Sequence, residues 1–103
     1  MSFEEFLAAP APPAGMGPAL QALWHLSRRE QAGGWERAHA CAQEADSREG
    51  AWVHAHLHRV EGDDANAGYW YARAGRKPPA KTVTFEAERE AITRALLASW
   101  QPR

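Results

Sequence analysis

The sequence is poor in cysteine, has no long apolar run and carries no marked excess of charge of either sign. Its single cysteine, Cys41, excludes an internal disulfide and a zinc site built from several cysteines. No apolar stretch approaches the roughly 20 residues that cross a bilayer, so we expect no membrane partner. Lys and Arg sum to 12 against 13 Asp and Glu, and this balance gives no electrostatic surface for nucleic acid.

The remaining composition is typical of a small folded domain. Of the 103 residues, 45% are hydrophobic and 24% are charged, which argues against disorder. The first residues, Met-Ser-Phe-Glu-Glu-Phe, are acidic where a signal peptide would be basic, and no apolar stretch follows. We therefore expect a soluble, cytoplasmic protein.

Strand-favouring residues are scarce, whereas Ala, Leu, Glu, Gln and Arg dominate, so the sequence predicts an all-α fold. Residues 1–18 are expected to hold a short helix and a proline-rich linker, and residues 19–103 a single helical domain. We expect one short helix near 3–9 and five main helices near 18–32, 35–45, 47–61, 64–74 and 85–99.

Glycines and capping residues mark the ends of these segments. Gly33-Gly34, Gly62 and Gly75 are typical of helix ends, while Asp63 and Thr84 are typical of helix beginnings. The run Asp46-Ser47-Arg48-Glu49 can form a capping box that opens the helix at 47–61. Helical spacing of apolar residues predicts the buried positions, which are Trp24, Leu57, Val60, Tyr71, Ile92 and Leu96.

An internal repeat accompanies this pattern. A shift of 29 positions places His25 on His54 and Gly33 on Gly62, and it superposes two helix-turn-helix units. A unit of this length made of two helices is typical of a tetratricopeptide-like stack. We therefore expect two stacked hairpins, with the helix at 85–99 as a cap across the end.

The second unit carries the stronger resemblance. Ala67, Tyr71, Ala74 and Pro79 stand at the spacing of the tetratricopeptide signature, and residues 66–74 resemble the Ala-x-x-Trp-Tyr-x-x-Ala helix of the sel-like subclass. In the first unit Ala42 replaces the aromatic residue and Gly50 the proline. The resemblance implies a groove that holds a peptide or a helix.

A narrower resemblance covers residues 52–63 and Tyr69-Trp70-Tyr71. This segment, WVHAHLHRVEGD followed by YWY, is similar to a family of small uncharacterised bacterial and fungal proteins. That resemblance supports the expected fold and implies no activity.

Polar stripes on two helices point to one seam. His54, His58 and Glu61 are four and three residues apart, and so share one helical face. On the preceding helix, Glu36, His39, Gln43 and Asp46 form a second stripe by the same spacing. Because consecutive helices of such a stack are neighbours, we expect the two stripes to face each other across a polar pocket.

The candidate ligand-binding residues of that pocket come from three helices, with an aromatic wall. They are His39, Gln43, His54, His58, Trp70 and Arg73. The competing interpretation is that these histidines are interhelical packing residues, bonded to backbone or to other side chains. His56 lies on a different side of its helix, so a histidine-rich helix need not form a site.

Two functions follow. The first is a binding or scaffold module for a peptide or protein partner, with no cofactor and no assigned metal ligand. The alternative is a small metal-binding protein or enzyme that uses the His/Gln/Asp pocket, since two imidazoles and a carboxylate on one face suit Zn²⁺. The sequence identifies no catalytic residue and no oligomeric state.

Overall fold

The computed structural model describes residues 1–13, 15–28 and 30–100, and the described part is all-α, with six helices and no strand. The last three positions of the expected 19–103 domain lie outside it. The helices are α1 (Phe3–Ala8), α2 (Pro18–Leu26), α3 (Gly34–Glu44), α4 (Arg48–Val60), α5 (Asp64–Ala74) and α6 (Phe85–Ser99).

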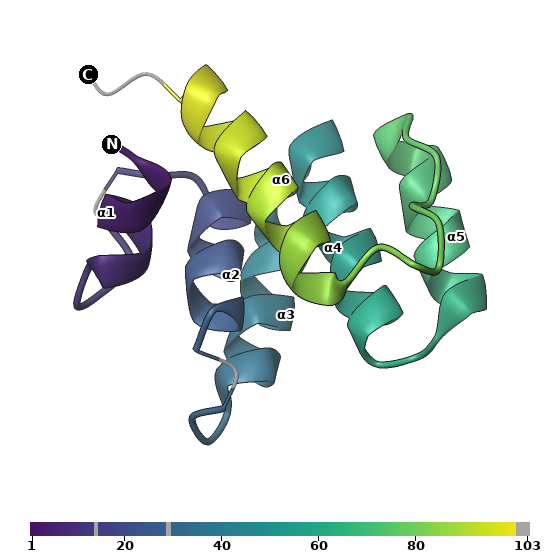
Figure 1. The fold of residues 1–103 in the computed structure, drawn as a ribbon, viewed down its shortest axis with the longest axis horizontal. Coiled ribbons are helices and arrows are strands. Elements are labelled where there is room, and N and C mark those ends of the chain that lie inside the picture. The colour runs from purple at the N-terminus through teal and green to yellow at the C-terminus, as the bar shows by residue number, and fades with distance from the viewer. Residues whose placement is uncertain (14, 29, 101–103) are drawn as a thin grey trace.

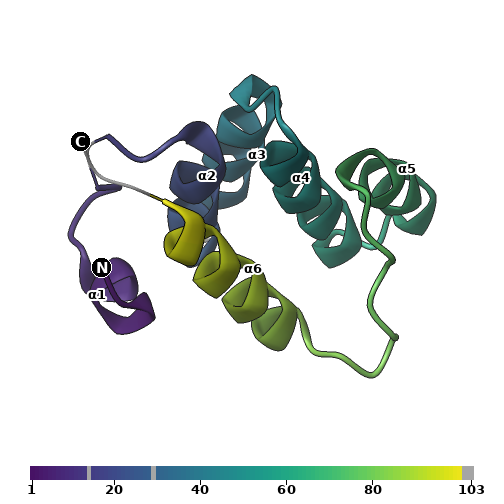
Figure 2. The same cartoon turned by 90° about the horizontal axis from the view of Figure 1, so that it is seen from above.

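Two helical hairpins form the body of the molecule. α2 packs along α3, α4 packs along α5, and α3 contacts α4, so the hairpins stack side by side (Figure 1). Seen from above, α2 and α3 lie at one end of the row and α5 at the other (Figure 2). This order makes α3, α4 and α5 neighbours, and the predicted polar stripes lie on these three helices.

The sixth helix lies on a face of this row. α6 crosses α2 and α4 and also contacts α1, whereas we expected it across the end of the stack (Figure 1). The reason is packing: Ile92 and Leu96 enter the same core cluster as Leu23 and Leu57. The face formed by α2 and α4 is therefore covered by the chain itself.

The predicted N-caps Asp63 and Thr84 are confirmed, whereas Ser47 caps α4 in place of Asp46, the first residue of the expected capping box. The side chains of Ser47, Asp63 and Thr84 each accept a hydrogen bond from the backbone N–H three residues on. Gly75, which follows α5, has φ 71°, a left-handed conformation that costs a residue without a Cβ atom little.

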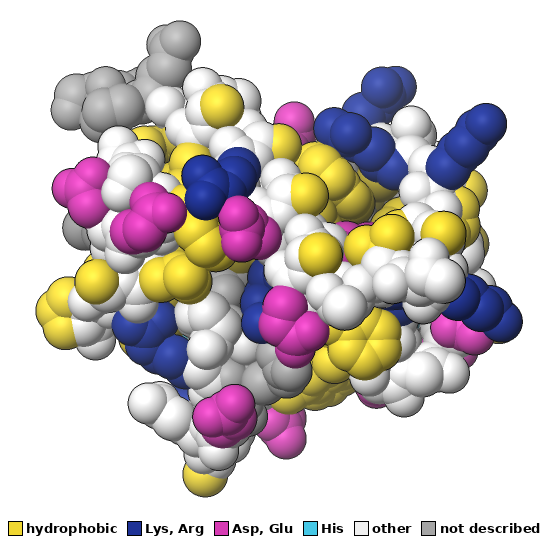
Figure 3. All heavy atoms as spheres, viewed as in Figure 1, with side chains coloured by type: hydrophobic (Ala, Val, Ile, Leu, Met, Phe, Trp, Pro, Cys, Tyr) yellow, Lys and Arg dark blue, Asp and Glu magenta, His cyan; other side chains and the backbone are white. Residues whose placement is uncertain are grey.

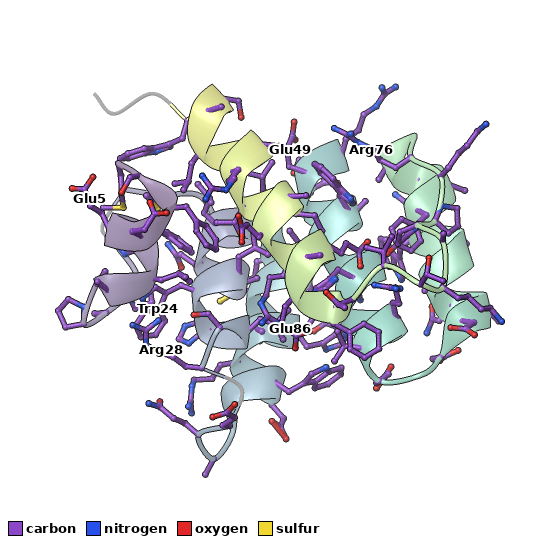
Figure 4. The ribbon with its side chains drawn as sticks, viewed as in Figure 1. Glu5, Trp24, Arg28, Glu49, Arg76 and Glu86 are labelled. Atoms are coloured by element: carbon purple, nitrogen blue, oxygen red, sulfur yellow. The ribbon has the colours of Figure 1, made fainter. Side chains whose placement is uncertain are left out.

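The prediction for α2 was wrong at its end. The helix stops at Leu26, six positions before the expected Ala32, because none of the described residues between Leu26 and Gly33 buries an apolar side chain. Ser27 Oγ donates back to the Trp24 carbonyl at 2.6 Å, and the Arg28 guanidinium lies 3.9 Å over the Trp24 ring (Figure 4). Arg28 also donates to the carbonyl of Ala9 at 2.8 Å, which ties α1 to α2.

The core matches the predicted positions apart from Val60, which is half-buried at the end of α4. Phe6 and Met16 belong to the same core cluster as the residues of α2 and α6, so the N-terminal segment packs onto the helical domain. No helix in the described part of the chain is long and apolar enough to cross a membrane.

Candidate functional site

Three histidines meet between the two hairpins. His39 comes from the middle of α3, and His54 and His58 come from successive turns of α4. The Nε2 atoms of His39 and His54 lie 3.1 Å apart and share one hydrogen. One ring nitrogen from each of the three side chains lies within 4.8 Å of the others. The two stripes thus face each other across one seam, which we call the histidine cluster.

Tryptophans enclose this cluster on two sides. The Trp35 ring stacks on His39 with centroids 5.0 Å apart, and the Trp70 ring stacks on His54 with centroids 4.0 Å apart. His54 is buried, while His39 is half-buried and gives the cluster its access to solvent. The sequence named Trp70 as a wall but missed Trp35, although its place four residues before His39 puts both side chains on one helical face.

A carboxylate orients the third histidine. His58 Nδ1–H donates to Glu61 Oε1 at 2.6 Å, one turn further along at the end of α4. This hydrogen bond orients the His58 ring and, in the neutral imidazole, places the free lone pair on Nε2. Glu61 and Asp63 also form a second group of possible metal ligands with His58, and both carboxylates are exposed.

Burial keeps two of these imidazoles neutral. Desolvation, together with the neighbouring His39 and His58, lowers the pKa of His54 to about 4. Desolvation also lowers the pKa of His39, with His58 adding to the effect and Glu61 opposing it. Both side chains therefore present uncharged nitrogens at neutral pH.

The other predicted site residues lie one helical turn along the same seam. Gln43, Trp70 and Arg73 line a pocket of about 310 Å³ together with Asp46. Arg73 donates to the Tyr69 hydroxyl at 3.0 Å. All six candidate residues thus lie along the α3/α4/α5 seam, with Trp70 shared between the histidine cluster and this pocket.

Sequence reasoning missed a second polar group, which is centred on Glu88 of α6. The Glu88 carboxylate accepts hydrogen bonds from His56 Nδ1 at 2.6 Å, from Arg59 Nη1 at 3.0 Å and from the Tyr71 hydroxyl. The sequence did carry a signal for the burial of Glu88, since this residue precedes Ile92 by four positions and so lies on the apolar stripe of α6.

Opposing effects act on the Glu88 carboxyl. Burial alone would raise its pKa, but the hydrogen bonds from His56, Tyr71 and Arg59 outweigh burial and leave the pKa below its usual value. Burial, together with the hydrogen bond to Glu88, raises the pKa of Tyr71. Glu88 is therefore an ionised carboxylate inside the protein, and it joins α6 to α4 and α5.

The histidine cluster lies away from the face that α6 covers. No histidine of the described residues is visible on that face in the space-filling view (Figure 3). Comparison with family models, with curated proteins and with solved structures finds no match. The tetratricopeptide-like resemblance therefore stays a prediction, and the site is interpreted from its own geometry.

Proposed function

We propose that the protein binds a divalent transition metal ion, with Zn²⁺ as the reference case, through His39, His54 and His58. The observation that carries this proposal is the convergence of three ring nitrogens within 4.8 Å, from two different helices. Two of the three residues are on α4, four positions apart, and the third reaches them from α3.

The spacing of the nitrogens is close to that of a metal site. Two ligands of one tetrahedral zinc ion, each about 2.0–2.1 Å from the metal, lie about 3.3 Å apart. The His39 and His54 Nε2 atoms are 3.1 Å apart, so a metal ion would replace the hydrogen that they share. Binding of one ion by all three residues requires the His58 ring nitrogen to move closer to the nitrogens of His39 and His54.

The surroundings also suit imidazole ligation. A histidine that binds a metal usually donates its other N–H to a carboxylate, as His58 does to Glu61. Neutral imidazoles suit zinc, copper and nickel more than magnesium or calcium, which prefer oxygen ligands. Three protein ligands leave one coordination position open, the pattern of catalytic rather than structural zinc sites.

The scaffold function predicted from the repeats has weaker support. A peptide-binding groove needs a free face, and α6 already lies across α2 and α4 (Figure 2). No other feature of the described residues favours a peptide partner over the metal, so the scaffold function stays a prediction.

Calorimetric titration of chelator-treated protein with Zn²⁺ tests the proposal. We expect one ion per chain, and the His54→Ala variant should bind it more than about 100-fold more weakly, since even an outer carboxylate contributes 10–100-fold to affinity. Cu²⁺ should also quench tryptophan fluorescence, because Trp35 and Trp70 stack on two of the ligands.

The matched control is His25→Ala. His25 is a half-buried histidine of α2 that packs edge-on against Trp24, outside the cluster. Its replacement should leave zinc affinity unchanged. Absence of stoichiometric zinc binding in the parent protein, or an equal loss in both variants, would disprove the metal site and leave the histidines as packing residues.

A further inference from the structure

A separate pocket lies where the beginning of α2, the α3–α4 connection and the end of α6 meet. It has a volume of about 320 Å³, and we call it the α2/α6 pocket. Leu20, Ala45, Leu96 and Trp100 form its apolar surface. None of the histidine-cluster residues lines it, so it is independent of the proposed metal site.

The rim of this pocket is acidic. Glu44, Asp46 and Glu49 are exposed and line the pocket from the end of α3 and the beginning of α4. No lysine, arginine or histidine of the described residues lines it, and the nearest of them, Arg48, lines neighbouring pockets with Asp46 and Glu49 and leaves the three carboxylates in excess. Glu49 lies beside the last turns of α6 (Figure 4). None of the three carboxylates forms an ion pair within the described part of the chain.

These features define the chemistry of a ligand. An aliphatic or aromatic body would bury apolar surface against Leu20, Leu96 and Trp100. The first turns of α2 and α4 contribute partial positive charge, but three full carboxylates outweigh it. A cationic head group at the rim would therefore be attracted, and an anionic one repelled.

We propose that the α2/α6 pocket binds a small organic cation, a primary amine attached to an apolar body. Trp100 also lines the pocket, and a tryptophan ring attracts an ammonium group placed over its face. The volume accommodates a chain of about eight carbons, within the range of ligand sites in proteins. Charge complementarity distinguishes this ligand from a fatty acid or a neutral alcohol of equal length.

Three probes of one chain length separate the apolar contribution from the electrostatic one. We expect octylamine to bind about tenfold more tightly than octanol at pH 7 and low ionic strength, and octanoate to bind more weakly than either, as measured by calorimetry below their micelle concentrations. Equal affinity for octylamine and octanoate, or no binding of octylamine, would overturn the proposal.

Variants locate the site. The double variant Glu44→Gln/Glu49→Gln should move octylamine affinity most of the way to that of octanol, since only Asp46 of the three rim carboxylates remains. Glu36→Gln, an exposed carboxylate of α3 outside the pocket, should change nothing. Ser99→Trp places a large ring in the pocket and should abolish binding of all three probes. Retention of octylamine binding by Ser99→Trp, with an unchanged melting temperature, would place the amine elsewhere.

Discussion

Glu88 is a buried carboxylate whose hydrogen bonds stabilise the fold. It is 7% exposed and accepts hydrogen bonds from three side chains on two other helices. Glu88→Gln leaves the half-buried Arg59 and the buried His56 without their carboxylate, so we expect the free energy of unfolding in urea titrations to fall by about 3 kcal/mol. The control is Glu90→Gln on the same helix, whose solvent-exposed pair with Arg94 contributes little to stability. Equal losses in the two variants would contradict a structural role for the buried network.

The same carboxylate predicts a dependence of stability on pH. The groups that face it are His56 and Arg59 from α4 and Tyr71 from α5. Because the pKa of Glu88 is lower in the folded protein than in the unfolded chain, its contribution is present above the unfolded value of 4.5 and is lost as pH falls below it. Urea midpoints measured between about pH 6 and 3 should fall less steeply for Glu88→Gln than for the parent. Parallel curves would show that another carboxylate is responsible.

A substitution of Glu61 tests whether its carboxylate orients the His58 ring for metal binding. If its carboxylate orients the His58 ring and makes the opposite nitrogen more basic, Glu61→Gln should weaken zinc binding about tenfold while leaving one ion per chain. The measurement is the calorimetric titration used for the histidine variants. Glu90→Gln, an exposed carboxylate of α6 outside the cluster, serves as the control and should leave the affinity unchanged.

At the scale of the helices, one substitution has opposite consequences at two glycines. A Cβ atom at Gly50 of α4 would lie 2.3 Å from the carbonyl oxygen of Ala45, closer than backbone atoms tolerate. Gly68 of α5 has nothing within 4 Å of the same position. Gly50→Ala should therefore lower stability, whereas Gly68→Ala should raise it by about 0.5–1 kcal/mol through helix propensity. Thermal melts of the two variants measure the difference, and a stabilising Gly50→Ala would refute the close approach.

Local chemistry made most element boundaries predictable from the sequence. Ser47, Asp63 and Thr84 begin helices because their side chains satisfy backbone N–H groups nearby, which needs no tertiary information. The end of α2 was not predicted because it depends on whether the residues that follow Leu26 can pack against the core, which the sequence alone does not show. The position of α6 was not predicted for a similar reason. Its apolar stripe shows that one side of the helix is buried, but not which other helices it packs against.

The sequence also predicted part of the candidate site. Spacing on α3 and α4 placed His39, His54 and His58 on facing stripes, because helical periodicity fixes which side chains share a face. Periodicity does not give the depth of burial, so the ionised Glu88 inside the core was not expected. The contact of Trp35 with His39 also needed the structure to establish ring stacking.

At the scale of the whole molecule, the proposed metal ion would join two hairpins. One ligand belongs to the α2/α3 hairpin and two belong to the α4/α5 hairpin, so binding requires their native stacking. A ligand at 100 times its dissociation constant stabilises the folded state by about 2.7 kcal/mol. For a domain of this size we expect Zn²⁺ to raise the melting temperature by about 10 °C or more. The His54→Ala variant should show no such rise, and an equal rise there would point to zinc binding elsewhere.

The position of α6 also has a consequence for how the protein is made. A ribosome releases the chain from the N-terminus at about 5–20 residues per second, so α1, α2 and α4 emerge well before the helix that covers them. Until Phe85–Ser99 has left the exit tunnel, the side chains of Leu23 and Leu57 that meet Ile92 in the core lack their cover. Folding during translation must therefore wait for α6, and nascent chains that stop short of it present an apolar surface for chaperones to recognise.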